Sequence, residues 1–227
     1  MKLSIVVPVY NEKNTILEVL RRIDSVDINM EKEVIIVDGC STDGTKEILK
    51  SLKNRHIKFI FEEKREGKGA AIIRGFKEAS GDIFLIQDAD LEVNPIEYPR
   101  LLRPILEEHV RVVYGSRFLY GRGLTRIKNY LGNKTVTWVL NLLFFTKLSD
   151  MATCYKVFVR DAWEKLDLNS KGFEIEAEIT INLIKNRERI VEIPIRYIPR
   201  SRSEGKKLHW GEGFRALQSI IKLRFTK

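Results

Sequence analysis

The sequence has 227 residues but only two cysteines, Cys40 and Cys154, and three histidines. Two cysteines cannot build the disulfide framework of a small secreted domain. The histidines are scattered along the chain, so neither a zinc site of Cys and His nor a His-based catalytic triad is expected. The composition therefore predicts an intracellular protein in a reduced state, and 44% hydrophobic residues are enough for a sizeable core.

Long apolar runs are also missing. The N-terminal run Leu3–Val9 contains Pro8 and is followed at once by polar residues, so it lacks the length and cleavage site of a signal peptide. The most apolar later stretch, Val136–Phe145, is interrupted by Thr137 and Asn141 and falls short of the roughly 20 residues that a membrane-spanning helix needs. These features predict a soluble, cytoplasmic protein that at most rests on a membrane.

Acidic residues are too few to balance the basic ones. Forty Lys and Arg against 31 Asp and Glu give a formal charge of +9, which predicts an anionic partner. Eight of the basic residues and only two Glu lie in the last segment, Arg200–Lys227. This segment also carries an apolar stripe at helical spacing: Trp210, Phe214, Leu217, Ile221 and Phe225. Such a basic amphipathic helix can lie on an anionic membrane or pack on its own domain, and both alternatives stay open.

Short β-branched runs alternate with amphipathic stretches along the first half of the chain. The pattern is typical of a mainly parallel sheet with helices on both faces, and we expect a single α/β domain over residues 1–227. The expected strands are Leu3–Val9, Val34–Val37, Ile57–Phe61, Ile83–Ile86, Val110–Tyr114, Cys154–Val159 and Ile190–Ile195. The expected helices are Thr15–Ile23, Thr45–Lys53, Ala70–Ala79, Pro95–Glu108, Tyr130–Phe145 and Ile175–Lys185, followed by a final helix near the C-terminus.

Two acidic residues, Asp88 and Asp90, directly follow the expected strand Ile83–Ile86. On extended backbone, side chains two residues apart point to the same side, so both carboxylates can bind one cation. Carboxylate oxygens favour Mg²⁺ or Mn²⁺ over zinc, and Glu92 continues the spacing as a third ligand. A solvated acidic turn is the alternative, because an isolated Asp-x-Asp motif occurs by chance in many chains.

Polar residues also follow the first two expected strands. The first strand leads into Tyr10 and Glu12, and the second ends at Asp38. Ligands of open α/β sheets bind at the carboxyl ends of the strands, the edge that also carries the acidic pair. We therefore expect Tyr10 to stack on a nucleobase and the two acids to bind base or ribose, whereas Asp43-Gly44 is expected to serve only as a turn and helix cap.

In combination, these motifs resemble family 2 glycosyltransferases, inverting enzymes of GT-A fold, and most closely the dolichyl-phosphate mannose synthase type. The second motif departs from the family pattern, since Gly39 stands where a second Asp is usual and Cys40 where Gly is usual. The resemblance implies a nucleotide-sugar-binding half over residues 1–115 and an acceptor half over residues 116–227. Further matching segments are Gly115-Ser116-Arg117, Asp150–Lys156 and Ile193-Pro194-Ile195.

The resemblance also implies roles for individual residues. Positions that hold the nucleoside are matched by Pro8, Tyr10, Glu12, Val37 and Asp38. The metal-binding motif is matched by Asp88, Ala89, Asp90 and Glu92, with Mg²⁺ or Mn²⁺ as the expected cofactor. The cationic positions around the donor diphosphate and the acceptor phosphate are matched by Arg117, Arg200 and Lys206. Guanidinium groups suit that task because they bind phosphate oxygens with two hydrogen bonds.

The expected reaction moves a hexose from GDP-mannose, UDP-glucose or UDP-N-acetylglucosamine to a polyprenyl monophosphate. A phosphate acceptor is already an anion and needs no general base, whereas a hydroxyl acceptor would need one, for which Asp150 is the first candidate. For Glu176 and Glu178 we expect only compensation of a helix N-terminus.

Two alternatives remain at this point: a glycosyltransferase with a hydroxyl acceptor, and a non-catalytic basic module for membranes or nucleic acid. Nucleic acid is not expected, because no aromatic-interleaved binding motif accompanies the basic residues. Many relatives of this type continue into transmembrane helices after the position where this sequence ends, so attachment to the inner face of the cell membrane is expected to be peripheral.

Overall fold

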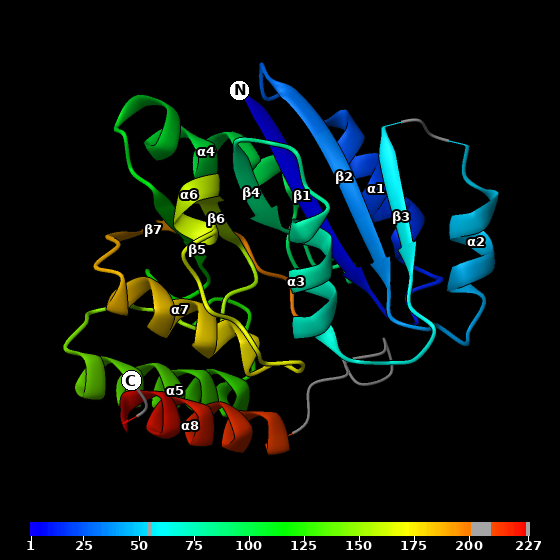
Figure 1. Cartoon of the computed structure of the whole chain (residues 1–227). Helices are drawn as coiled ribbons and strands as arrows, with labels where there is room; N and C mark the ends of the chain where they lie inside the picture. Colours follow the sequence, from blue (N-terminus) through cyan, green and yellow to red (C-terminus); the bar gives the residue numbers. More distant parts are fainter. Residues whose placement is uncertain (54–55, 201–209, 226–227) are drawn as a thin grey trace.

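The computed structural model describes residues 1–53, 56–200 and 210–225. Seven strands form one sheet in the order β3-β2-β1-β4-β6-β5-β7 (Figure 1). The strands are β1 Lys2–Val9, β2 Glu31–Asp38, β3 Ile57–Phe61, β4 Ile83–Ile86, β5 Val112–Ser116, β6 Lys156–Val159 and β7 Ile190–Pro194. All seven were expected from the sequence, with small differences at their ends.

The sheet is mixed but mainly parallel, as expected. Strands β1, β2, β3 and β4 run parallel to one another, and β5 runs parallel to β7. Strand β6 is antiparallel to both of its neighbours, β4 and β5. The six other strands therefore end at one edge of the sheet, and the residues that precede β6 lie at that edge too. Every polar motif of the sequence that follows a strand is thereby brought to a single edge.

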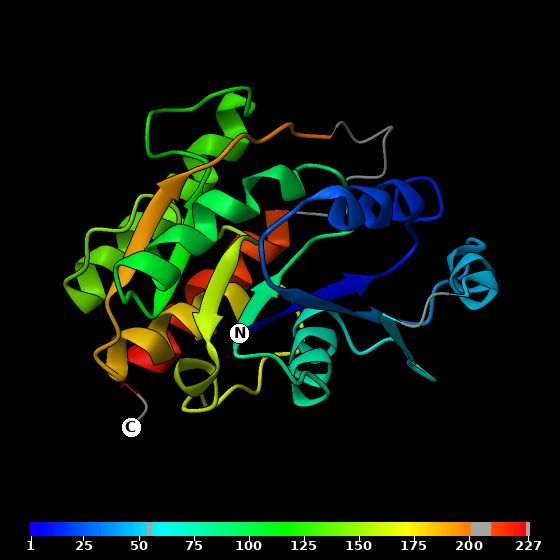
Figure 2. The same ribbon diagram turned by 90° about the horizontal axis from the view of Figure 1, so that it is seen from above.

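Helices cover both faces of the sheet (Figure 2). On one face, α1 (Ile16–Ser25), α2 (Thr45–Ser51) and α4 (Tyr98–Glu107) pack against residues such as Ile5, Val7 and Leu85. On the other face, α3 (Lys68–Lys77), α6 (Arg160–Trp163) and α7 (Ile175–Lys185) pack against Val6, Ile35 and Phe84. Successive strand residues thus enter opposite cores, which explains why the strands are apolar almost throughout. The short α6 and the 3₁₀ turn Pro95–Glu97 before α4 were not distinguished in the sequence.

Two further helices, α5 (Ile127–Phe144) and α8 (Trp210–Phe225), form an additional layer beneath α7. A third apolar cluster joins Val136 and Leu140 of α5, Ile181 of α7 and Ile220 of α8. Helix α8 therefore packs on its own domain, one of the two alternatives that the sequence left open. Its buried side is centred on Ile220, with Leu217 packed against the cluster.

Candidate active site

Arg117 follows β5 and is held by Asp150, which lies shortly before β6. The guanidinium donates Nε to Oδ2 at 2.7 Å and Nη2 to Oδ1 at 2.8 Å, and the Arg117 backbone N–H donates to Oδ2 at 3.0 Å. Asp150 is fully buried. Burial lowers the pKa of Arg117, but the Asp150 carboxylate overcomes this effect and raises the pKa above its usual value. The pair provides a rigid guanidinium at the carboxyl edge of the sheet.

This geometry argues against Asp150 as a general base. Both of its oxygens accept hydrogen bonds from the Arg117 guanidinium, so the carboxylate is already engaged as an acceptor. The acid is also enclosed, because Glu192 accepts hydrogen bonds from the backbone N–H groups of Ser149 and Asp150. In the structure the Asp150 carboxylate therefore holds the Arg117 guanidinium in place.

A second guanidinium, that of Arg200, lies between the acids that follow β1 and β4. It donates Nη1 to Glu12 Oε2 at 2.9 Å and Nη2 to Glu12 Oε1 at 3.1 Å. Its Nη2 also donates to Asp90 Oδ2 at 3.2 Å. Glu12 and Asp90 are 78 positions apart in the sequence, and Arg200 is more than 100 beyond Asp90, so only the fold unites them. The structure thus brings together three residues for which the resemblance implies different roles: Glu12 at the nucleoside, Asp90 at the metal and Arg200 at a phosphate. These roles stay predictions.

Glu92 lies differently from the expectation. Residues 89–92 form a turn and a bend rather than extended backbone, and Leu91 adopts the left-handed region with φ of 62°. The Glu92 carboxylate accepts hydrogen bonds from Tyr197 Oη and from the Arg200 backbone N–H, both at 2.7 Å. It thereby fixes the segment that follows β7. Each oxygen keeps a second lone pair, so the role of Glu92 as a third metal ligand stays a prediction. The Arg117 guanidinium lies 5.2 Å from the Tyr197 ring centre, so this segment links both arginines.

The Asp88 carboxylate forms an ion pair with a residue that the sequence analysis did not select. Lys68 Nζ, at the start of α3, lies 2.8 Å from Asp88 Oδ1 and 3.0 Å from Glu176 Oε1. Glu176 in turn pairs with the fully buried Lys156. Glu176 lies in the first turn of α7, as expected, but its carboxylate also bridges the ammonium groups of Lys68 and the buried Lys156.

Could Asp88 and Asp90 hold a divalent cation? Among the described residues, no three Asp, Glu, His or Cys side chains are grouped closely enough to form a complete metal cage. Burial, together with the charges of Asp88 and Glu92, raises the pKa of Asp90 to about 7, and Arg200 opposes the rise. Carboxylates that repel each other in this way are stabilised by a cation, and Mg²⁺ commonly takes only one or two carboxylates plus phosphate oxygens and water. The pair therefore fits the expected ion, and its ligand role stays a prediction.

The residues expected to contact the nucleoside are only partly suited to it. Asp38 ends β2 with one carboxylate oxygen, Oδ2, accepting from the Ser41 backbone N–H at 3.2 Å. The Val37 side chain is fully buried in the core against α3, so it has no free surface for a ligand. Ala89, which the resemblance places in the metal-binding motif, is also buried and packs in the other core. Pro8 is part of β1 and Tyr10 directly follows this strand, while Lys206 lies outside the described residues.

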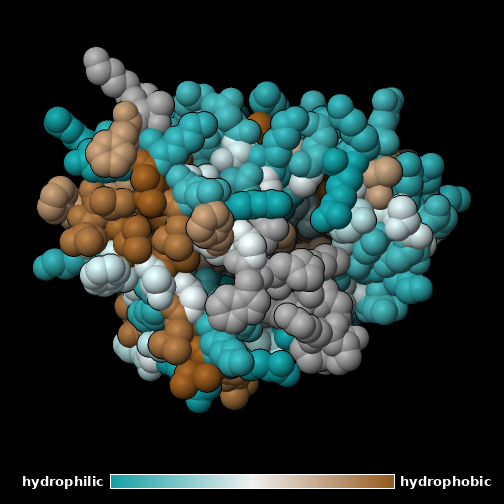
Figure 3. Space-filling model, turned by 90° about the horizontal axis from the view of Figure 1, so that it is seen from below, coloured by the Kyte–Doolittle hydropathy of each residue, from teal (hydrophilic) through white to brown (hydrophobic). Residues whose placement is uncertain are grey.

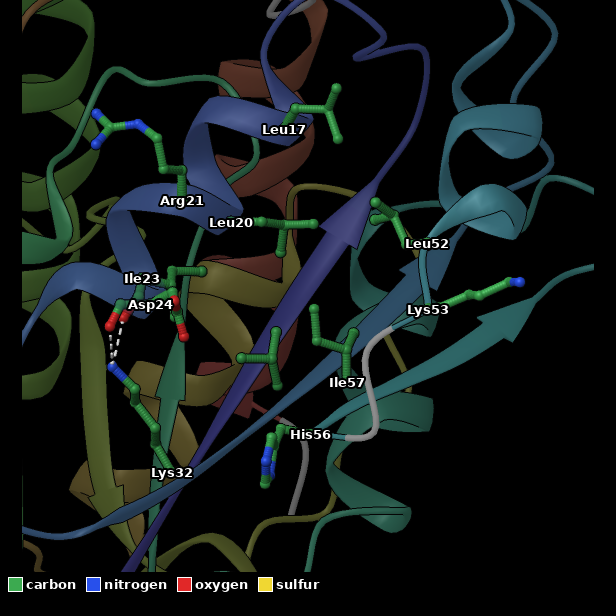
Figure 4. Close-up of a pocket in the computed structure, with 11 residues that line it drawn as sticks. Leu17, Leu20, Arg21, Ile23, Asp24, Lys32, Leu52, Lys53, His56 and Ile57 are labelled. Atoms are coloured by element: carbon green, nitrogen blue, oxygen red, sulfur yellow. Dashed lines mark hydrogen bonds between the residues drawn. The ribbon is translucent and has the colours of Figure 1, made fainter.

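A separate pocket of about 280 Å³ lies at the other end of the sheet (Figure 4). It is lined by apolar residues of α1 and by the first residues of β2 and β3, including Leu20, Ile23 and Ile57. Lys32 reaches across and donates to three carbonyl oxygens at the C-terminus of α1, each at 2.8 Å. None of the site residues described above lines it. We therefore assign no catalytic role to this pocket.

Comparison with known proteins identifies relatives of this chain. The chain is 34% identical over 212 residues to a dolichol-phosphate mannosyltransferase of Pyrococcus furiosus, covering 91% of this chain and 59% of the relative. It is 27% identical over 218 residues to an undecaprenyl-phosphate mannosyltransferase of Micrococcus luteus, covering 91% of this chain and 87% of the relative. The chain thus spans little more than half the length of the first of these relatives.

The fold matches a crystal structure of glucosyl-3-phosphoglycerate synthase from Mycobacterium tuberculosis in complex with Mn²⁺, UDP and phosphoglyceric acid. The TM-score is 0.77 at 21% sequence identity, with coverage of 100% of this chain and 79% of the other. This likeness confirms the expected GT-A fold. A sequence profile described as "Glycosyl transferase family 2" matches residues 4–167, most of the chain. The chain therefore belongs to glycosyl transferase family 2.

Proposed function

We propose that this protein transfers a hexose from a nucleotide-sugar donor to a polyprenyl monophosphate. The observation that carries the choice of acceptor is the pairing of both Asp150 oxygens with Arg117. This pairing leaves Asp150 unsuited to remove a proton from an alcohol, and it presents a cation that suits a phosphate. The names of the two curated mannosyltransferase relatives, which act on dolichol phosphate and undecaprenyl phosphate, support the same choice.

In the proposed reaction, an oxygen of the acceptor phosphate attacks the anomeric carbon of the sugar. The bond between that carbon and the donor's diphosphate breaks, and the nucleoside diphosphate leaves with the electron pair. No proton has to move, because the attacking oxygen is already an anion. A divalent cation at Asp88 and Asp90 would supply charge stabilisation for the leaving group. Arg200 and Arg117 are placed to reduce the repulsion between the two phosphate-bearing substrates.

The acceptor can be identified by offering two lipids that differ only in the phosphate. We expect the purified protein, with Mn²⁺ and a panel of nucleotide sugars, to glycosylate a polyprenyl monophosphate at least 100-fold faster than the corresponding free polyprenol. Product formation is measured by mass spectrometry of the extracted lipid. Transfer to the alcohol alone would contradict the proposed acceptor and favour a hydroxyl-specific glycosyltransferase.

We also propose that the protein contacts an anionic membrane through α5 and α8. None of the described helices is long and apolar enough to cross a membrane. The outer sides of α5 and α8 nevertheless expose large apolar side chains, and Figure 3 shows brown surface gathered on this side of the molecule. The exposed residues are Ile127, Leu131, Trp138, Leu142, Phe145, Phe214, Ile221 and Phe225. Lys128, Arg215, Lys222 and Arg224 are exposed on the same two helices. Apolar side chains interspersed with cations are typical of a helix pair that rests on anionic lipid.

Vesicle binding tests this surface. Changing Trp138→Glu and Phe145→Glu together is expected to lower binding to vesicles with about 30% anionic lipid at least tenfold, because two large side chains no longer enter the apolar layer. Binding is measured by co-sedimentation. The matched control is Ile96→Glu, an equally exposed apolar residue elsewhere on the molecule (67% exposed), which should bind as the wild type does. An equal loss of vesicle binding by the Ile96→Glu control would contradict the proposal that α5 and α8 form the membrane-binding surface.

A further inference from the structure

A buried glutamate, Glu62, lies next to Asp38 at the carboxyl ends of β2 and β3. Glu62 directly follows β3 and is 2% exposed, while Asp38 is the last residue of β2 and is fully buried. Their strands are parallel, and the Glu62 backbone N–H donates to the Asp38 carbonyl at 2.9 Å. The sequence analysis did not select Glu62, because it stands in the charged run that follows β3.

These two acids offer more hydrogen-bond acceptors than the described part of the protein uses. Asp38 Oδ1 and both carboxylate oxygens of Glu62 are buried and accept no hydrogen bond of normal geometry from the described residues. Arg74 Nη1 lies 3.2 Å from Glu62 Oε1 and contributes charge. Burial raises the pKa of Glu62. The Arg74 charge and the Glu66 backbone N–H lower it, and the Glu66 and Asp38 carboxylates raise it further. Buried acceptors are nearly always paired, so the incompletely satisfied oxygens of Asp38 and Glu62 at a ligand edge indicate donors from a ligand.

The neighbouring residues provide room and a flat surface. Gly39 has no side chain, and a Cβ atom placed there would lie 3.7 Å from Glu62 Oε2 and 4.0 Å from the Tyr10 Cβ. The Glu62 carboxylate therefore occupies the region that a second acid at position 39 would reach. The Tyr10 ring is covered by the guanidinium of Arg65, whose carbon lies 4.0 Å from the ring centre. Arg65 itself is exposed, so a planar base can replace its guanidinium on this ring.

We propose that Asp38 and Glu62 form a carboxylate pair that selects guanine as the base of the donor nucleotide. This inference rests on the proposed function. Guanine presents two adjacent donor groups, N1–H and the N2 amino group, which match a set of buried carboxylate oxygens. Uracil presents a single N–H between two carbonyl oxygens, and these carbonyls would be repelled by the carboxylates. A site with buried acceptors rejects a ligand that leaves them unpaired.

The affinities of the wild-type protein for three nucleotides test whether the Asp38–Glu62 pair selects guanine. We expect GDP to bind at least 30-fold more tightly than UDP, and at least tenfold more tightly than IDP, which lacks only the 2-amino group of GDP. Dissociation constants are measured by titration calorimetry with excess Mg²⁺. Tighter binding of UDP than of GDP, or equal binding of GDP and IDP, would overturn the inference and leave the proposed function intact. If none of the three binds, the proposed function fails and the inference fails with it.

The variant Glu62→Gln tests whether Glu62 itself determines the preference for guanine. In Glu62→Gln the ratio of GDP to IDP affinity is expected to fall to about threefold or less, since the amide keeps a single acceptor and adds a donor. The matched control Glu63→Gln changes the exposed neighbour and should keep the wild-type ratio. An unchanged ratio in Glu62→Gln would exclude this residue as the reader of the base. Thermal unfolding checks that the Glu62→Gln variant is folded. If the variant is unfolded, the relative affinities of the wild-type protein for GDP, UDP and IDP still test whether the site selects guanine.

Discussion

Replacing Asp90 with asparagine is expected to lower the rate of sugar transfer about 1,000-fold or more. Asp90 is one of two acids proposed to bind the divalent cation, and it also holds Arg200 at 3.2 Å. The substitution removes the charge that both interactions need, and the loss of such stabilisation in a buried site costs several kcal/mol in the transition state. Initial rates over a titration of Mn²⁺ measure the effect. The matched control is Asp24→Asn, an exposed acid at the opposite end of the sheet, which should keep wild-type rates.

The free energy of unfolding shows whether Asp90→Asn loses activity because the site has changed or because the protein no longer folds. The pKa of Asp90 is raised to about 7, mainly by burial and by Asp88, so its ionisation in the folded protein is unfavourable compared with the unfolded chain. Ionised Asp90 therefore destabilises the metal-free protein as pH rises from about 4 through 7, and this penalty is absent below about pH 4. Asp90→Asn should be at least as stable as the wild type at pH 7.5 without metal, and the gap should close on acidification. Normal Mn²⁺-dependent transfer by the Asp90→Asn variant would remove Asp90 from the site.

Replacing Arg117 with lysine is expected to lower kcat/KM for the lipid phosphate at least 100-fold while leaving the protein folded. Lysine keeps a positive charge beside the buried Asp150, but it cannot make the paired contacts at 2.7 and 2.8 Å that orient the guanidinium. Arg117→Ala should be worse in both respects, because it leaves Asp150 buried without its partner and lowers the free energy of unfolding by about 3 to 5 kcal/mol. Steady-state kinetics and urea unfolding measure the two effects.

A second arginine serves as the control for this comparison. Arg111 also binds two acids, Asp161 at 2.8 Å and Glu188 at 3.0 Å, but on a part of the molecule away from the proposed site. Arg111→Lys should therefore leave kcat/KM unchanged. If Arg117→Lys retained wild-type kcat/KM as well, Arg117 would be a structural residue and the proposed contact with phosphate would be wrong.

The polar residues at the ends of the strands show which features of the site can be predicted from the sequence. Buried strands leave uninterrupted Val, Ile and Phe runs, and a change to Asp or Arg at the end of a run marks the edge of the sheet. Asp38 and Asp88 were found in this way, whereas Arg117 was matched only through the family resemblance. Parallel topology places the backbones of all three on one edge. The position of Cys40, where the family motif usually has Gly, was also visible, and the structure shows it in the left-handed region with φ of 64°.

The partners of charged side chains could not be predicted from the sequence in the same way. An ion pair leaves no periodic trace in the sequence, so nothing in the chain connected Arg200 with Glu12 or Lys68 with Glu176. Lys68 stands between two glycines at the start of a helix, but this pattern does not match a P-loop, so nothing in the sequence marks it as a partner of the acids. Glu62 stood in a run of charges, and only its burial sets it apart from Glu63.

For this protein the sequence alone determined the secondary structure, the α/β class and the edge at which its polar residues gather, because strand and helix periodicity are local properties. The tertiary structure decided which acid faces which cation. It turned Glu92 toward Tyr197, gave both Asp150 oxygens to Arg117 and buried α8 on its Ile220 side, leaving Phe214 and Phe225 exposed. Those outcomes depend on distances between segments that lie far apart in the chain, and such distances exist only once the sheet has formed.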